Sequence, residues 1–382
     1  MILTQTKALF VDAYRELNAR KLFWITMALS VVVAAAIATL GIDEKSVTFL
    51  WFRLDFLPLN TTVFSAKAFY LTVFSSLGIG LWLTWAATIL ALISTASIMP
   101  DLISGGVIET LLSKPISRWR LLFTKFLTGL MFVALQVGVF SVLSMLVIGI
   151  RGGYWEPRIL LAIPIVVVFF SYLFSFSMLI GLLTRSTLAA ILVTGVCWAL
   201  IFGVNLTDSI VMQFTEAVRL EVEEREERVE LATTNTQKLI RRTMEDQTTA
   251  QDYQPTRDEI LGQNPFLEGM ETELEENRES LARLERWNTI VFAVKTAVPK
   301  TAETIALLNR WTIDPDAFSR LGAESNEDVE INSEIEIDQS ELQRRLDERY
   351  RARSLTWVVG SSLVFEGVIL GLCLIVFRRR DF

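Results

Sequence analysis

The sequence contains no histidine and only two cysteines, Cys197 and Cys373. Without histidine, the chain has no imidazole to act as a general base, to activate a serine or to bind a metal. The two cysteines stand in separate apolar stretches, so they form neither a disulfide framework nor a paired-cysteine metal site. We expect both to pack as small apolar side chains.

The dipeptide Gly-Lys is also missing from the sequence. The phosphate-binding loop of ATPases requires it, because this lysine contacts the β- and γ-phosphates while backbone amides surround them. The chain therefore does not bind ATP through such a loop.

Charged residues are scarce outside one segment. Residues 205–354 hold 33 acidic and 19 basic residues, a net charge of −14, whereas the rest of the chain holds 10 acidic and 17 basic residues. Hydrophobic residues make up 52% of the 382 residues, and the mean hydropathy is +0.42. These values exclude a single soluble globule and indicate an apolar, basic part with an acidic, polar insert.

Six stretches are long and apolar enough to cross a bilayer, which requires about 20 residues per helix. The sequence therefore predicts an all-α membrane protein with six transmembrane helices and a large, mainly helical extracytoplasmic insert between helices 5 and 6. The six predicted spans are residues 22–42, 68–99, 126–150, 159–184, 186–206 and 355–377.

Lysine and arginine in the short loops gather on one predicted side, with twelve on that side and five on the other. Because short loops rich in these residues stay in the cytoplasm, both termini are predicted to be cytoplasmic. The chain is thus expected to be a multi-pass protein of the cell (inner) membrane. Its predicted parts are a cytoplasmic amphipathic helix at 1–21, spans 1–5 within 22–204, the insert at 205–354, the sixth span at 355–377 and a basic tail at 378–382.

Residues 100–125 join the second and third spans on the predicted cytoplasmic side. Gly106 and the glycine before it interrupt the chain, and residues 107–113 are predicted to form a short helix with an apolar face. Pro115 ends that helix, because the residue before a proline avoids the α conformation. Ser117 is placed to cap the next helix. The pattern indicates a short helix along the membrane surface, and the alternative is an ordinary basic loop.

This loop resembles the signature of type-2 ABC exporter permeases, which follows their second span. Segments 14–21, 294–301 and 377–382 also resemble parts of the family, and within it the chain is most similar to permeases labelled for multicopper enzyme maturation. The family pattern Gly-x-x-Glu-Thr-Leu-Leu-Ser-x-Pro-Ile-Ser-Arg is matched by Gly106, Glu109, Thr110, Leu111, Leu112, Ser113, Pro115, Ile116, Ser117 and Arg118.

The resemblance implies a membrane-spanning permease subunit of an ATP-driven exporter, which is not itself an enzyme. In the family this loop docks into the ATPase and transmits its motion, so the matched residues are expected to couple the partner, with Glu109 and Arg118 meeting it directly. The resemblance further implies a separate P-loop ATPase subunit that carries ATP and Mg, and a second copy of the chain (a homodimer) or a homologous permease. No cofactor, metal or nucleic acid is expected on this chain, and the lipid bilayer surrounds its spans.

Glu366 is the one ionisable side chain in the middle of a predicted span. A carboxylate in hydrocarbon costs on the order of 3 kcal/mol, so this side chain should face protein or water. One interpretation is a residue of the substrate path or gate, and the other is a protonated carboxyl bonded to a serine or threonine of a neighbouring helix. Gly367 and Gly371 form a small-x-x-x-small pair that favours close helix packing.

The insert is predicted to contain two helices, residues 214–247 and 267–288, which form an antiparallel, coiled-coil-like hairpin across a polar connection at 248–265. Two i,i+4 ion pairs are expected in the first helix, Glu221 with Arg225 and Glu224 with Arg228. Residues 290–310 are predicted to form an amphipathic helix at the membrane interface with a kink at Pro299, and 338–354 a charged helix. The hairpin surface is either a solvated face or a docking arm for an external protein.

A different class of function stays open at this stage. The chain could be a non-transporting membrane scaffold or sensor that recruits an extracytoplasmic partner through its helical hairpin. The hairpin favours this interpretation and the coupling-loop motif disfavours it. An intramembrane hydrolase has little support, because Glu366 has no second carboxylate within a span and the chain has no histidine.

Overall fold

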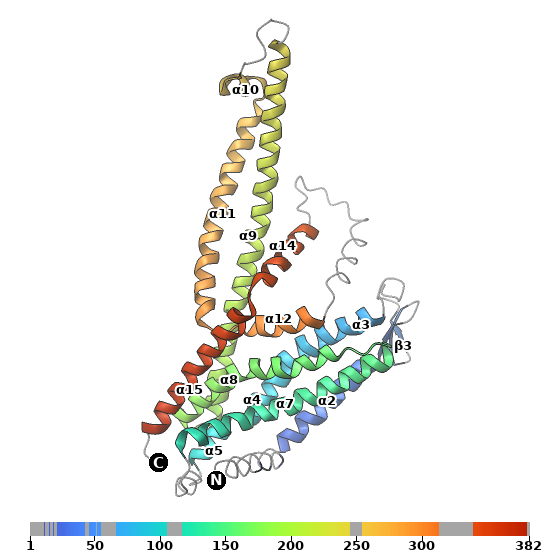
Figure 1. Cartoon of the computed structure of the whole chain (residues 1–382), viewed down its shortest axis with the longest axis vertical. Helices are drawn as coiled ribbons and strands as arrows, with labels where there is room; N and C mark the ends of the chain where they lie inside the picture. Colours follow the sequence, from blue (N-terminus) through green and yellow to red (C-terminus); the bar gives the residue numbers. More distant parts are fainter. Residues whose placement is uncertain are drawn as a thin grey trace. The chain divides into compact units, whose positions relative to one another are not determined.

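The computed structural model describes residues 11, 15, 18, 21–42, 46–50, 52–54, 66–104, 117–244, 254–312 and 339–379 (Figure 1). The chain divides into two compact units, which are considered separately below. The membrane unit comprises residues 1–203, 296–327 and 354–382, and the arm unit comprises residues 204–295 and 328–353.

Six helices among the described residues are long and apolar enough to cross a membrane, and the predicted all-α membrane fold is confirmed. The first is α2 (Lys21–Thr39) and the second is the run α3 (Ala66–Val73), η1 (Phe74–Ala87), α4 (Thr88–Thr95) and α5 (Ile98–Ser104). They are followed by α7 (Arg118–Arg151), by η2 (Pro157–Leu161) with α8 (Ala162–Thr184), by α9 (Thr187–Met244), and by η3 (Thr356–Gly360) with α15 (Ser361–Arg379).

Helix α8 is the centre of the membrane unit, where it packs against α7, α15, α12 (Thr301–Thr312) and α5. Its aromatic side chains fill this core, and the ring of Phe174 stacks on Phe126 of α7 with 5.7 Å between centroids. Gly129 of α7 makes this contact possible, since a Cβ at that position would lie 2.3 Å from the Phe174 ring. The close α7–α8 approach therefore depends on a residue without a side chain.

A small antiparallel sheet follows the first span. Strands β1 (Leu40–Ile42), β2 (Val47–Phe49) and β3 (Phe52–Leu54) pair in sequence order, with Leu40 opposite Phe49 and Val47 opposite Leu54. Strands β2 and β3 form a short hairpin between the first and second spans. Residues 55–59 lie outside the described part of the chain.

The predicted helix at 290–310 is wrong in its extent. The structure has two helices there, α11 (Phe266–Ala297) and α12, separated at Pro299. The buried side chains of α12 include Ile305, Leu307 and Leu308, and this helix packs on α8. Proline ends the first helix because it has no amide hydrogen. The apolar face of the second helix is covered by protein, which sequence periodicity does not distinguish from lipid.

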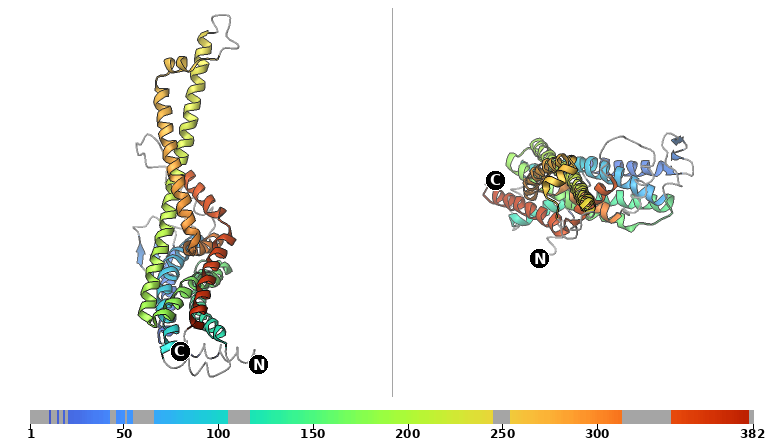
Figure 2. Two further views of the ribbon diagram at one scale, coloured as in Figure 1. Left: turned by 90° about the vertical axis from the view of Figure 1, so that its left-hand side faces the viewer. Right: turned by 90° about the horizontal axis from the view of Figure 1, so that it is seen from above.

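The arm unit pairs the part of α9 after residue 203 with α11, and α10 (Arg257–Gln263) lies between them along the chain (Figures 1 and 2). Ion pairs join Arg219 to Glu285 and Glu226 to Arg278. The residue numbers of the α11 partners fall as those on α9 rise, so the two helices are antiparallel. Helix α10 was not predicted, although Thr256 and Glu259 form a capping box at its start.

Both predicted i,i+4 ion pairs of α9 are confirmed. The Arg225 and Glu221 side chains approach to 3.0 Å, and those of Arg228 and Glu224 to 3.9 Å. Arg225 also forms an ion pair with Glu273 of α11. It therefore links α9 to α11 in addition to linking two turns of α9.

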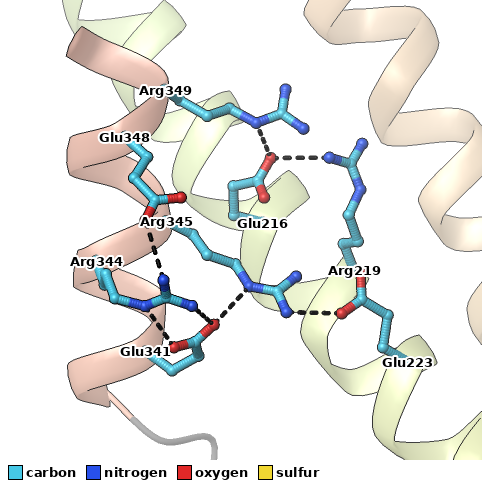
Figure 3. A network of polar contacts seen from close by, with 8 residues as sticks. All are labelled: Glu216, Arg219, Glu223, Glu341, Arg344, Arg345, Glu348 and Arg349. Carbon is cyan, nitrogen blue, oxygen red and sulfur yellow. Dashed lines mark hydrogen bonds and ion pairs between the residues drawn. The ribbon is translucent and has the colours of Figure 1, made fainter. Parts of the chain in front are cut away.

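Helix α14 (Gln339–Ala352) attaches to α9 through charged side chains (Figure 3). Arg349 contacts the buried Glu216 carboxylate at 2.6 Å, and Arg345 contacts Glu223 at 2.8 Å. Arg345 also holds Glu341 of its own helix at 2.9 Å. The attachment is therefore mainly ionic, with Leu346 as a buried apolar contribution.

A fully buried carboxylate joins three helices of the arm unit. Asp208 of α9 receives Lys295 of α11 at 2.6 Å and Arg353, which follows α14, at 2.9 Å, both on the oxygen Oδ2. The Asp208 and Lys295 side chains are 0% and 1% exposed. Charges at such a site must be matched, because water does not compensate the loss of a partner.

We predict that Asp208→Ala destabilises the arm unit by about 3–5 kcal/mol, because two buried cations lose their counter-ion. The control is Glu226→Ala, which removes one member of a solvent-exposed pair and should cost less than about 1 kcal/mol. Thermal unfolding of the purified protein, followed by proteolysis of the arm, measures both. Equal effects of the two substitutions would contradict the buried cluster.

The order within α14 should also depend on pH. Hydrogen bonds from Arg344 and Arg345, both on α14 itself, lower the pKa of Glu341 from 4.5 to about 2. A lowered pKa in the folded state means that the contribution of Glu341 is complete above its unfolded pKa and is lost as the pH falls toward about 2. We therefore expect a spin label on α14 to become more mobile as the pH falls below about 4.5. Glu341→Gln should raise this mobility at neutral pH and reduce its change between pH 4.5 and about 2.

Candidate functional site

The predicted coupling loop lies partly outside the described residues. Seven of its candidate residues cannot be placed for this reason: Gly106, Glu109, Thr110, Leu111, Leu112, Ser113 and Pro115. Their partner-coupling role stays a prediction. The structure does describe both ends of the loop, α5 before it and Ser117 with Arg118 after it.

The start of the loop is fixed against the fourth span. Helix α5 packs on α8, and a Cβ added at Gly181 of α8 would lie 3.1 Å from the Pro100 ring. This tight approach leaves α5 little room to move independently of α8.

Ser117 occupies the N-cap position of α7, with an extended backbone (φ −68°, ψ 137°) and a carbonyl that accepts a 3.2 Å bond from the amide of Leu121. The predicted cap by its side chain is absent, since the Ser117 hydroxyl makes no capping hydrogen bond. Its backbone position is thus as expected, and the stabilisation that a side-chain cap gives is not present.

Arg118 is the first residue of α7, and its side chain reaches the C-terminal end of the sixth span. Its Nη1 donates to the carbonyl oxygens of Phe377 at 3.0 Å and of Arg378 at 3.1 Å, in the last turn of α15. The last carbonyls of a helix have no partner within that helix, and a cation there interacts favourably with the helix dipole. Arg118 therefore links the residue after the loop to the end of α15. Direct contact of Arg118 with a partner stays a prediction.

Glu366 lies at the contact of α15 with α8. Its side chain is buried, and its Oε2 lies 2.6 Å from Oγ of Ser171. The same serine hydroxyl lies 2.8 Å from the carbonyl oxygen of Val168. A hydroxyl has one hydrogen to donate, so Ser171 either shares it between Val168 and Glu366 or donates to Val168 and accepts from a protonated Glu366. This is the neighbouring serine that the packing interpretation requires, and a role in a substrate path stays a prediction.

A second polar contact joins the same span to α12, and the sequence did not indicate it. The amide of Lys300 donates to Oγ of Ser362 at 2.9 Å, and that hydroxyl donates to the carbonyl of Val358 at 2.7 Å. The Lys300 side chain is fully buried, its Nζ bonds the carbonyl of Thr296 at 2.7 Å, and it lies 5.0 Å from the centroid of the Trp357 ring. The local signal was Pro299, which lacks the amide hydrogen that would donate the next helical hydrogen bond.

Tyr172 completes this polar region from the side of α8. Its side chain is buried, and its hydroxyl faces Thr304, Ser362 and Glu366. No described residue lies in hydrogen-bonding geometry with this hydroxyl. Three helices, α8, α12 and α15, thus bring buried polar side chains together inside the apolar core of the membrane unit.

Gly367 and Gly371 do not pack closely inside this chain. A Cβ at either position would meet no described atom within 4 Å. The expected close helix packing is therefore not made within the described chain, and packing against a second copy stays a prediction.

Comparison with known proteins gives one match. A family model described as "ABC-2 family transporter protein" matches residues 90–298, more than half of the chain. The matched segment begins in α4, includes the loop and continues to the region of Pro299. It does not test the similarity to permeases for multicopper enzyme maturation. No curated protein and no solved structure gives a significant match.

We predict that Glu366→Gln keeps the thermal stability of the wild-type protein within about 1 kcal/mol, because a neutral amide can donate to Ser171 as the protonated carboxyl does. Ser171→Ala should cost about 1–3 kcal/mol, because it leaves a buried carboxyl without its partner. Thermal unfolding in detergent and in lipid measures both variants. If Glu366→Gln is the more damaging of the two, Glu366 carries a negative charge instead.

Proposed function

The chain belongs to the ABC-2 family of transporter proteins, and we propose that it is the permease subunit of an exporter that a separate ATPase drives. As a family member it is a multi-pass membrane component of an ABC transporter. The proposal adds three points: the direction of transport, the coupling through residues 100–125, and the ATPase as the partner at that loop.

The observation that carries the proposed coupling is the bond of Arg118 to α15. A loop that only connects two spans needs no tie to a third, but Arg118 joins the end of this loop to the last turn of the sixth span. The other end of the loop is packed on α8 through Pro100 and Gly181. A push on residues 105–116 would therefore reach α8 and α15 without passing through the lipid.

In the proposed mechanism, ATP-driven closure of the partner moves the short helix that the sequence predicts at 107–113, with Glu109 in contact with the ATPase. Arg118 is a positioning residue that carries this motion to α15. The contacts of α15 with Ser171 and with Lys300 pass it to α8 and α12. These spans then rock between states open to either side of the membrane.

The proposed assembly has two permeases and two ATPases. ATP and Mg bind the ATPase, since this chain has no Gly-Lys dipeptide and hence no phosphate-binding loop. A second copy or a homologous permease would complete the pathway, and the open sides of Gly367 and Gly371 give one helix face where it could pack. The loop side, with both termini, is proposed to be cytoplasmic in the cell (inner) membrane.

The alternative function is a scaffold that recruits an external protein through the arm unit. The observation in its favour is the ion-paired surface of α9 and α11, where exposed charges lie on α9 from Glu223 onward and on α11 up to Arg286. This function requires no ATPase, so association with an ATPase discriminates between the two proposals.

The first test is co-purification of the tagged chain with the P-loop ATPase encoded nearest its gene. We expect a complex with the wild-type chain, its loss with Glu109→Arg, and its retention with Glu226→Arg, which reverses an exposed charge in the arm unit. A wild-type chain that purifies without any candidate ATPase would replace the exporter by the scaffold.

The same complex tests the role of Arg118. Spin labels at Trp119→Cys and Leu372→Cys, both exposed positions, report the distance between α7 and α15. In the wild type this distance should hold when ATP is added, because the two helices move together. With Arg118→Ala the distance should broaden on ATP addition, because the hydrogen bonds to the end of α15 are lost. Arg379→Ala removes an exposed cation from the same end of α15 and should behave as wild type.

A further inference from the structure

The exposed face of α9 stays apolar beyond the boundary between the two units. Leu206, Ile210 and Phe214 are all exposed, and they follow Leu188, Leu192 and Val196 by eighteen residues each. Eighteen residues are about five helical turns, so both sets lie on the same face of one helix. The lipid-facing stripe of the fifth span therefore continues into the arm unit.

Charged side chains on this part of α9 point the other way. Asp208 and Glu216 are buried at 0% and 2% exposure, and the first exposed charged residue of α9 is Glu223. The remaining exposed residues between 204 and 215, Thr207 and Gln213, are uncharged. A water-facing helix has the opposite arrangement, with charges outside and apolar residues inside.

The end of α11 shows the same inversion independently. From Trp287 to Ala297 the exposed side chains are uncharged and include Ile290, Phe292 and Val294, while the one charged residue, Lys295, is buried. Arg286 is the last exposed charge before this stretch. A tryptophan next to the last exposed charges is typical of the boundary between headgroups and acyl chains.

The length of the apolar face agrees with a lipid environment. From Leu188 to Phe214 an α-helix rises about 39 Å, whereas the hydrocarbon core of a bilayer is about 30 Å thick and about 40–45 Å with its headgroups. The stripe is thus long enough to reach the headgroup layer with a tilted helix.

We propose that the base of the arm unit, residues 204–214 of α9 and 287–295 of α11, is embedded in the lipid of the membrane leaflet on the arm side. Acyl chains cover its exposed apolar face, and the Asp208–Lys295–Arg353 cluster is its charged interior. Arg351, exposed at the end of α14, meets the headgroup phosphates. This inference is independent of the ATPase and of the direction of transport.

Spin labelling of the full chain in liposomes tests the proposal. Single cysteines replace Leu206, Phe214 and Ile290 in a chain with Cys197→Ala and Cys373→Ala. Collision with oxygen, which concentrates in lipid, is compared with collision with a water-soluble nickel chelate. We expect the three labels to collide more with oxygen than with nickel. Leu231 and Leu239, exposed leucines further along α9, are matched controls and should show the reverse.

Two other outcomes would overturn the proposal. Nickel collision at Leu206 and Phe214 equal to that at Leu231 would place the base of the arm in water. Low collision with both reagents would mean that protein covers this face, either a second copy of the chain or an external partner. All five positions are exposed, so the substitutions should leave the fold intact. A variant that fails to fold is identified by its loss of monodisperse elution, and the exposed position Ile210 or Val294 is then labelled instead.

Discussion

Hydrocarbon offers no hydrogen-bond partner, so a polar group within a span is stabilised where the protein itself supplies one. Several serine and threonine side chains find such a partner locally, by donating to carbonyls of the preceding turn. Ser30 bonds the carbonyl of Thr26, Thr95 that of Ala91 and Thr128 that of Thr124. Groups that cannot be satisfied locally need a partner from another helix, and these partners decide which helices stay together.

The sixth span is the clearest result of this constraint. Glu366 finds Ser171 on α8, Ser362 accepts from the amide of Lys300 before α12, and the carbonyls at the end of α15 accept from Arg118. Each contact stabilises α15 against a different helix. Because the partners are polar and directional, α15 cannot slide along its neighbours as a purely apolar helix could. A displacement at one of these contacts is therefore carried by the whole span.

The sequence predicted what depends on neighbouring residues. The six spans follow from length and hydropathy, the ion pairs of α9 from i,i+4 spacing, and the loop motif from a contiguous pattern. Partners distant in sequence could not be predicted in this way. Arg118 and Phe377 are separated by 259 residues, and nothing near either one indicates the other. The burial of α12 against α8 could not be predicted for a related reason. A helix face covered by another helix has the same amphipathic pattern as one covered by lipid.

The inverted polarity at the base of the arm unit follows from the same constraint. Asp208, Lys295 and Arg353 come from three separate segments, and each lies within five residues of a boundary between the units. Charges that are buried in this way are tolerated when they neutralise one another inside the protein. Arg353 directly precedes the segment that forms the sixth span, and Arg118 bonds the far end of that span. The sixth span thus begins directly after one arginine contact and ends at another.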